Sequence, residues 1–259
     1  MSEEALPPLP AFLIVGAQKG ATRWLRLNLG RHPEIFTAEE ELSFFNGDDY
    51  EQGLDSYRRR FEGWSGEPVV GEATPGYMIW RHDPALVAER IDESLPGVRL
   101  FAVLRDPVDR LYSAFVHHVK RGRLDPDQDL LELVRATPPE EDGLQLVAGG
   151  WYARSLEPYM SRFGERLTVF LTEEARAHPE QVYRTALEQL GVNDSFVPDE
   201  LADVVFSRRL PKKTRYWRRG DGRRPLADEE KRELASYFRD DVERLEQMLG
   251  RDLSAWKHR

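Results

Sequence analysis

The sequence predicts an α/β fold with three layers, in which a central, mainly parallel sheet is flanked by helices. Short apolar runs without polar alternation occupy residues 12–15, 100–104 and 167–171, and such runs are typical of buried parallel strands. Segments with apolar residues at helical spacing follow these runs. Strands that alternate with helices favour a parallel sheet covered on both faces, which is a three-layer αβα arrangement.

The first predicted elements are a strand, a glycine-bearing turn and a helix. The strand at 12–15 runs into Gly16, and helical spacing then relates Ala21, Trp24, Leu25 and Leu29. The strand at 100–104 runs into Arg105-Asp106-Pro107, where proline near the first position favours the start of a helix. The apolar stripe of that helix consists of Val108, Leu111, Tyr112, Phe115 and Val119.

The remaining elements follow from shorter signals. Val69-Val70 indicates a further short strand, and apolar spacing predicts helices at 84–93, 153–163, 179–190 and 228–249. Two stretches interrupt the alternation. Residues 121–148 are polar with prolines, and residues 207–225 are rich in arginine and lysine. Both are predicted to be lid loops near a ligand, because loops often carry function.

Length and composition limit the class of protein. The 259 residues suit a single domain over 1–259, with two small domains as the alternative, and 40% hydrophobic residues support a folded core. The net charge of −9 argues against broad attraction to nucleic acid, so no nucleic-acid partner is expected. The absence of cysteine excludes disulfides and thiolate metal sites. Residues 1–10 are predicted to be a flexible N-terminus without a signal peptide, and no apolar run is long enough for a membrane span. We therefore expect a soluble, cytoplasmic protein.

The stretch from Gly16 to Trp24 has the properties of an anion-binding loop. It lies between a predicted strand and a predicted helix, where unpaired N–H groups and the helix dipole favour negative charge. A turn with nothing bound is the alternative interpretation. The loop is not a Walker A motif, because Lys19 is followed by Gly-Ala-Thr. It is not a dinucleotide fingerprint, because Gln18 occupies the place of the second glycine. The residues predicted to bind the anion are Gln18, Lys19, Gly20, Ala21, Thr22, Arg23 and Trp24.

Val-Gly-Ala-Gln-Lys-Gly-Ala-Thr-Arg-Trp-Leu at 15–25 resembles the 5′-phosphosulfate loop of sulfotransferases that use PAPS (3′-phosphoadenosine-5′-phosphosulfate). The match is closer to the heparan-sulfate and carbohydrate branch and to its bacterial relatives, although Ala21 replaces a glycine of the family pattern. Arg105-Asp106-Pro107 through Ser113 resembles the family's 3′-phosphate motif. The resemblance implies a P-loop-like three-layer fold, with PAPS as donor and PAP as product. It also implies contacts to the 3′-phosphate from Arg105 and Ser113.

Weaker matches follow in the same order along most of the chain. They include an acidic segment before Phe44-Phe45, the segment Gly71–Tyr77 and the segment from Gly150 onward. By this resemblance Lys19 stabilises the leaving group and Glu41 is the catalytic base. Some members carry a catalytic lysine where this chain has Ala73. The predicted acceptor contacts are Glu41, Phe45, Glu72, Tyr77, Trp151 and Tyr152.

Nine cations occur within residues 208–224, against the single acid Asp221. In a chain of net negative charge this segregation indicates either a solvated loop or a lid over a polyanionic nucleotide. Gly222-Arg223-Arg224 partly matches a basic loop of the family near the 3′-phosphate. Arg223 and Arg224 are therefore predicted to contact the nucleotide.

The sequence thus predicts transfer of a sulfuryl group from PAPS to a hydroxyl or amine of a carbohydrate, a glycosylated metabolite or another small molecule, without a metal. Two alternatives stay open. A P-loop-type kinase or NTPase shares the strand–loop–helix physics, and a non-catalytic nucleotide- or RNA-binding module would bind without turnover.

Overall fold

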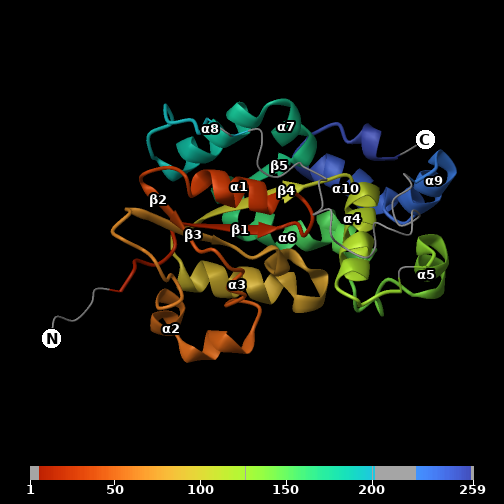
Figure 1. Cartoon of the computed structure of the whole chain (residues 1–259), viewed down its shortest axis with the longest axis horizontal. Helices are drawn as coiled ribbons and strands as arrows, with labels where there is room; N and C mark the ends of the chain where they lie inside the picture. Colours follow the sequence, from red (N-terminus) through yellow and green to blue (C-terminus); the bar gives the residue numbers. More distant parts are fainter. Residues whose placement is uncertain (1–5, 126, 200, 202–225, 258–259) are drawn as a thin grey trace. The chain divides into compact units, whose positions relative to one another are not determined.

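A computed structural model describes residues 6–125, 127–199, 201 and 226–257 of the chain (Figure 1). The chain divides into two compact units. The first consists of residues 1–104 and 156–206, and the second of residues 105–155 and 207–259. The first unit contains the sheet, and the elements described in the second unit are helices.

The sheet of the first unit has five parallel strands in the order β2-β3-β1-β4-β5. The predicted strands are all present. The strand β2 is an addition, because three residues give too short a pattern to be recognised from sequence. The strands are β1 (Phe12–Gly16), β2 (Ile35–Thr37), β3 (Val69–Ala73), β4 (Arg99–Leu104) and β5 (Leu167–Leu171).

Helices cover both faces of this sheet, with α1 and α8 on one side and α3 on the other (Figure 1). Alternate strand residues such as Phe12, Ile14 and Phe101 pack with apolar residues of α1 and α8 in one buried cluster. The predicted α/β three-layer fold is therefore confirmed. The α-helices of this unit are α1 (Thr22–Leu29), α2 (Leu54–Arg58), α3 (Pro84–Ser94), α7 (Thr172–Ala177), α8 (Pro179–Leu190) and, from Leu156, most of α6 (Tyr152–Phe163).

Short 3₁₀ turns connect several of these elements. In the first unit they are η1 (Asp48–Gln52), η2 (Pro75–Met78), η3 (Trp80–His82) and η5 (Gly164–Arg166). The turn η2 follows β3 after Thr74, whose N–H donates to the carbonyl of Ile14 in β1 (3.1 Å).

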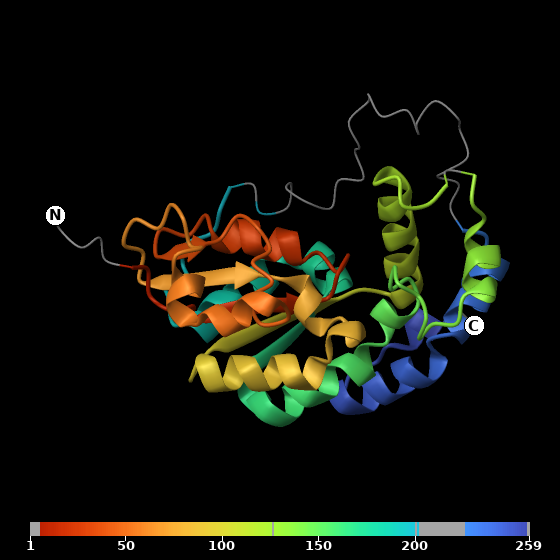
Figure 2. The ribbon, with the colours of Figure 1, turned by 90° about the horizontal axis from the view of Figure 1, so that it is seen from below.

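The second unit is built on α4 (Pro107–Lys120), which Figure 2 shows in side view. Asp106 caps this helix, because its carboxylate accepts the N–H groups of Val108 (2.9 Å) and Asp109 (3.0 Å). Pro107 occupies the first helical position, as the sequence predicted. The other elements described in this unit are α5 (Leu130–Ala136), η4 (Ala148–Gly150), α9 (Asp228–Ser236), α10 (Arg239–Leu249) and η7 (Ser254–Lys257).

Two sequence expectations need correction. The predicted single helix at 228–249 is two helices, since α9 ends at Ser236 and α10 begins at Arg239. At the break the Tyr237 carbonyl accepts the indole N–H of Trp151 (3.2 Å). Apolar spacing continues through the break, because residues on either side of it, such as Leu234 and Val242, are buried. The predicted loop at 121–148 contains the helix α5, whose N-terminus is capped by Asp129.

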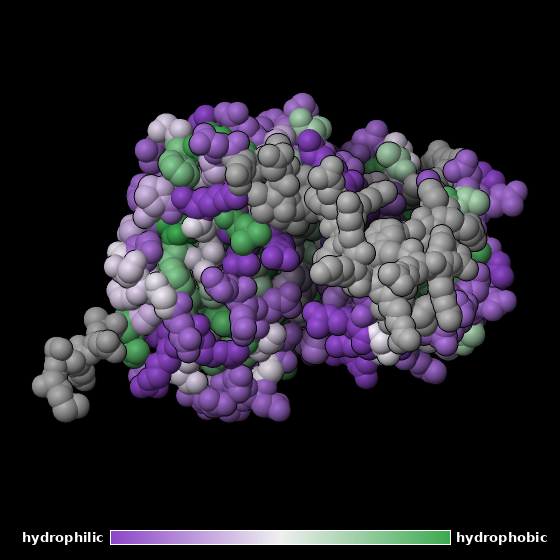
Figure 3. Space-filling model, in the orientation of Figure 1, coloured by the Kyte–Doolittle hydropathy of each residue, from purple (hydrophilic) through white to green (hydrophobic). Residues whose placement is uncertain are grey.

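The surface carries few large apolar side chains. Of the described residues, Leu86 is the one large hydrophobic side chain that is largely exposed, at 42%. On the visible face of the first unit, apolar groups are small and separated by polar residues (Figure 3). Among the described residues, no helix combines the length and apolar character that a bilayer span requires.

Candidate active site

The predicted anion-binding loop lies at the carboxyl end of β1 in the first unit. Its backbone is tied to the neighbouring strand, because Ala17 N–H donates to the carbonyl of Val103 (3.0 Å). Gly20 is pressed against that same carbonyl, and a Cβ at this position would lie 2.0 Å from the Val103 oxygen. Thr172 Oγ1 lies within hydrogen-bond distance of the carbonyls of Gly20 (3.1 Å) and Leu104 (2.9 Å). The loop is therefore held in one shape by β4 and α7.

The first turn of α1 is open to an anion. Its N-cap residue is Ala21, so no side chain caps the N-terminal N–H groups. Lys19 (φ 71°) and Ala21 (φ 69°) both adopt the left-handed conformation, which is strained for a residue with a Cβ. Such strain is typical of functional sites. Together with the helix dipole, the geometry suits a phosphate or sulfate group.

Lys19 and Glu41 lie close enough to interact electrostatically. Although Glu41 is exposed overall, desolvation of its carboxyl raises its pKa above the ordinary value of 4.5, while the positive charges of Lys19 and Arg26 lower it. The guanidinium of Arg26 also donates to the carbonyl of Ala38 (3.0 Å), ahead of the acidic segment. The fold thus places the predicted base near the predicted cation, although 22 positions separate them in the sequence.

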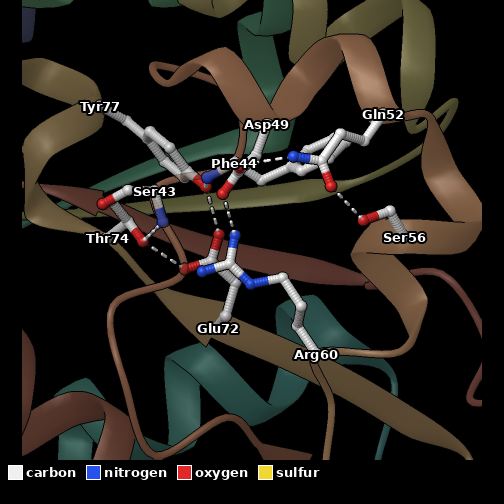
Figure 4. Close-up of polar contacts among 9 residues, drawn as sticks. All are labelled: Ser43, Phe44, Asp49, Gln52, Ser56, Arg60, Glu72, Thr74 and Tyr77. Atoms are coloured by element: carbon white, nitrogen blue, oxygen red, sulfur yellow. Dashed lines mark hydrogen bonds and ion pairs between the residues drawn. The ribbon is translucent and has the colours of Figure 1, made fainter.

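A buried carboxylate lies beneath the segment that follows Glu41. Glu72 is 0% exposed, and three hydroxyls donate to it, of which Figure 4 shows those of Thr74 and Tyr77. Thr74 Oγ1 is 2.7 Å from Oε2, and the hydroxyls of Tyr77 (2.7 Å) and Tyr57 (3.2 Å) both reach Oε1. Burial raises the pKa of Glu72 to about 7, while the hydrogen bonds from Thr74, Tyr77 and Tyr57 and the charge of Arg60 lower it.

Arg105 begins the second unit, directly after the last residue of β4. Its guanidinium donates to the Asp109 carboxylate one helical turn on (2.9 Å), and its carbonyl accepts the hydroxyl of Tyr152 (2.9 Å). Its Nε is buried and has no hydrogen-bond partner among the described residues. An arginine with an unused buried donor can accept a further anionic partner. Ser113 lies two turns further along α4 and is partly exposed.

The other predicted site residues differ in their exposure to solvent. Phe45 and Tyr77 are fully buried, as is Glu72, and this favours a role beneath the site over direct contact with an acceptor. Trp24 is buried too, and its indole N–H donates to the Leu201 carbonyl (2.8 Å), so its backbone alone borders the loop. Gln18 and Lys19 are partly exposed, Thr22 is buried and Arg23 is exposed.

In the second unit, Trp151 is partly exposed and Tyr152 is buried. The guanidinium of Arg154 lies 5.4 Å from the Trp151 ring. Arg223 and Arg224, with the whole predicted lid at 207–225, lie outside the described residues. Among the residues that are described, no group of three acidic, histidine or cysteine side chains could hold a metal ion.

Sequence reasoning missed three residues that organise these regions. Arg110 is fully buried and donates to the carbonyls of Gln145 (2.9 Å) and Leu146, which fixes the segment before Trp151. Thr74 and Tyr57 complete the Glu72 cluster. Arg110 could have been singled out from the sequence, because it is part of the motif that begins with Arg105-Asp106-Pro107. Tyr57 carried no local signal, because it reaches Glu72 only through the fold.

Comparisons with known proteins agree on one family. Residues 9–208 match the model of the sulfotransferase domain. The chain is similar to a sulfotransferase from Alicyclobacillus acidocaldarius whose crystal structure is known. That similarity has a TM-score of 0.75 and 30% identity, over 97% of this chain and 100% of that one.

Curated relatives belong to the heparan-sulfate branch that the motifs indicated. The chain is 27% identical over 289 residues to the bifunctional heparan sulfate N-deacetylase/N-sulfotransferase 1 of Xenopus laevis, and 28% identical over 289 residues to that of Mus musculus. Each match covers 98% of this chain and 31% of the relative, so the chain spans about a third of the length of these proteins.

The family model covers most of the chain, and the solved structure covers nearly all of it. The predicted resemblance to sulfotransferases is confirmed, which decides against a kinase or a binding module. The chain belongs to the sulfotransferase family and is a sulfotransferase enzyme.

Proposed function

We propose that this enzyme transfers the sulfuryl group of PAPS to a hydroxyl or amine of a carbohydrate or of a glycosylated or other small metabolite, and releases PAP. The proposal is supported by the uncapped N-terminus of α1 and by Glu41 lying within electrostatic range of Lys19 in the loop before that helix. A transfer site needs an anion cradle, a cation at the leaving oxygen and a base at the acceptor. The loop before α1, Lys19 and Glu41, all in the first unit, are our candidates for these three roles.

The loop residues bind and orient the donor. The N–H groups at the start of α1, with Thr22 and Arg23, hold the 5′-phosphosulfate. The acceptor atom attacks the sulfur in line with the bridging oxygen, the sulfur–oxygen bond to PAP breaks, and the electron pair stays on that oxygen. Lys19 stabilises the charge that develops there, and Glu41 takes the acceptor proton. By the family motif, Arg105 and Ser113 bind the 3′-phosphate of the donor.

The acceptor class follows from the relatives rather than from the site. The curated relatives are named for heparan sulfate N-deacetylation and N-sulfation. We therefore favour an amino sugar or a sugar hydroxyl as the acceptor group of this chain. Desolvation raises the pKa of the Glu41 carboxyl above its ordinary value, which makes its carboxylate a stronger base toward such a group.

The test uses PAPS labelled with ³⁵S and a panel of amino sugars, sugar alcohols and N-desulfated heparan oligosaccharides, in the presence of excess EDTA. Glu41→Gln removes the base but keeps the size of the side chain. It is expected to lower transfer by about 10²–10⁴-fold with PAP affinity nearly unchanged. Glu40→Gln is the matched control, because it removes an exposed charge from the adjacent position. Full activity of Glu41→Gln would end its assignment as base.

A further inference from the structure

The buried carboxylate of Glu72 is connected to the backbone that carries Glu41. Each of two hydroxyls that donate to Glu72 also accepts a backbone N–H (Figure 4). Thr74 Oγ1 accepts from Ser43 N–H (3.1 Å), and the Tyr77 hydroxyl accepts from Phe44 N–H (3.1 Å). Because each hydroxyl has one proton, its donation to the carboxylate leaves its oxygen free to accept from the backbone. Glu72 therefore sets the direction of both hydroxyls.

These two hydrogen bonds act on a strained and well-anchored part of the chain. Ser43 adopts a left-handed conformation (φ 52°), which is uncommon for a residue with a Cβ. Phe44 and Phe45 follow it and are both fully buried, with the Phe44 ring stacked on Tyr57 at 4.4 Å. Such a conformation persists only when its surroundings hold it, and Thr74 and Tyr77 supply the polar part of that support.

Glu41 lies two residues before Ser43 and within electrostatic range of Lys19, so the conformation held at residues 43 and 44 limits where its carboxyl can lie. We infer that Glu72 is a positioning residue for sulfuryl transfer, which acts through Thr74 and Tyr77 to hold the segment that carries the catalytic base. The inference rests on the proposed role of Glu41. Burying a carboxylate costs free energy even when it is hydrogen-bonded, and the positioning role gives a reason for this cost.

This role differs from direct binding of the acceptor by Glu72 or Tyr77. Both side chains are 0% exposed, and the Tyr77 carbonyl also accepts the hydroxyl of Tyr159 (2.7 Å). A residue that binds the acceptor changes the KM for that acceptor. A residue that positions the base lowers kcat and leaves KM and PAP affinity unchanged.

The experiment removes one hydroxyl at a time, because Glu72→Gln would change the stability of the fold together with its geometry. Thr74→Val deletes the hydroxyl that connects Glu72 to Ser43 and keeps the shape of the side chain. Thr74→Ser restores that hydroxyl. Tyr57→Phe is the matched control. It also deletes a hydroxyl that donates to Glu72 (3.2 Å), but this hydroxyl accepts neither the Ser43 N–H nor the Phe44 N–H.

Steady-state kinetics with ³⁵S-PAPS are expected to show a kcat for Thr74→Val that is at least about 10-fold below wild type, since small displacements of a catalytic group cost this much or more. PAP affinity and the KM for the acceptor should stay within about twofold of wild type. Thr74→Ser should recover most of the rate, and Tyr57→Phe should stay within about twofold of wild type although its melting temperature falls.

A double variant shows whether the effect passes through Glu41. Adding Thr74→Val to Glu41→Gln should lower the residual rate by less than about twofold, because the group that Thr74 positions is already gone. A further full 10-fold loss, an unchanged kcat for Thr74→Val, or a rise in acceptor KM alone would each overturn the inference. In these cases a low rate of Glu41→Gln alone would still support the proposed base, so the two proposals fail separately.

Discussion

Desolvation raises the pKa of the Glu41 carboxyl, while the charges of Lys19 and Arg26 lower it. Because a base must be deprotonated, kcat/KM should fall as the pH falls through the pKa of Glu41, and this acid limb should lie above pH 4.5. The position of the limb therefore reports the balance between desolvation and the two cations.

Arg26→Gln tests this balance while leaving Lys19 in place. Its charge lowers the pKa of Glu41, so its removal should move the acid limb of kcat/KM to higher pH. The measurement is a pH–rate profile of both proteins, with Arg31→Gln, beyond the end of α1, as the control. Superimposed profiles, or a limb that moves to lower pH, would show that Glu41 is not the titrating base.

Glu72 makes a second prediction at the residue scale, on stability. Its pKa is about 7 in the folded chain and 4.5 for an ordinary glutamate, so the folded state keeps its proton over a range in which the unfolded state loses it. This contribution to the free energy of unfolding is fully present below pH 4.5 and is lost as the pH rises through about 7. The shift corresponds to about 3 kcal/mol.

Urea unfolding of wild type and Glu72→Gln at pH 5 and pH 8 measures this contribution of Glu72 to the free energy of unfolding. The groups that face the carboxylate are Tyr57, Thr74, Tyr77 and Arg60, and they are the same in both proteins. Wild type should lose stability relative to the variant between the two pH values. Parallel pH dependence in the two proteins would contradict the buried-carboxylate description.

At the scale of elements, the conformation of the loop between β1 and α1 requires glycine at position 20 but not at position 21. Gly20→Ala would place a Cβ 2.0 Å from the Val103 carbonyl, so the loop must move. We expect a loss of about 1–3 kcal/mol of stability and weaker PAP binding. Ala21→Gly should keep or raise the melting temperature, because Ala21 is left-handed (φ 69°) and glycine adopts that conformation without strain.

Thermal melting with and without PAP checks both variants. The pair is internally controlled, since each variant changes one methyl group in the same loop. Equal effects of the two variants would show that the loop is not held against β4 as described.

The sequence predicted long elements well and short or long-range features poorly. The strands at 12–15, 100–104 and 167–171 were evident because buried parallel strands are continuously apolar. The strand β2 has three residues and the helix α7 has six, too few for a period to emerge. The break at Tyr237-Phe238 was hidden because apolar residues continue at helical spacing across it; the Tyr237 carbonyl there accepts the indole N–H of Trp151, 86 positions earlier. Predicting the pairing of Lys19 with Glu41 required a family resemblance, since no local pattern relates them.

At the scale of the whole molecule, we propose that the donor is recognised through both its 5′-phosphosulfate and its 3′-phosphate. The first unit supplies the loop and Glu41, and Arg105 and Ser113 belong to the second. Because the loop and the Arg105 motif would each bind a different phosphate, we expect both sets of residues to contribute to PAP affinity. ADP carries the adenosine and a 5′-diphosphate but no 3′-phosphate, so it reports binding that does not depend on a 3′-phosphate contact.

Calorimetric titration of PAP and ADP into wild type and Arg105→Ala therefore tests the central claim most directly. Arg105 has a buried Nε without a partner among the described residues, and one charge-assisted hydrogen bond to phosphate stabilises by about 1.5–3 kcal/mol. The account predicts that wild type binds PAP at least about 10-fold more tightly than ADP, and that Arg105→Ala removes most of this preference while leaving ADP affinity unchanged. Equal affinity of wild type for PAP and ADP would contradict a donor site built for two separate phosphates.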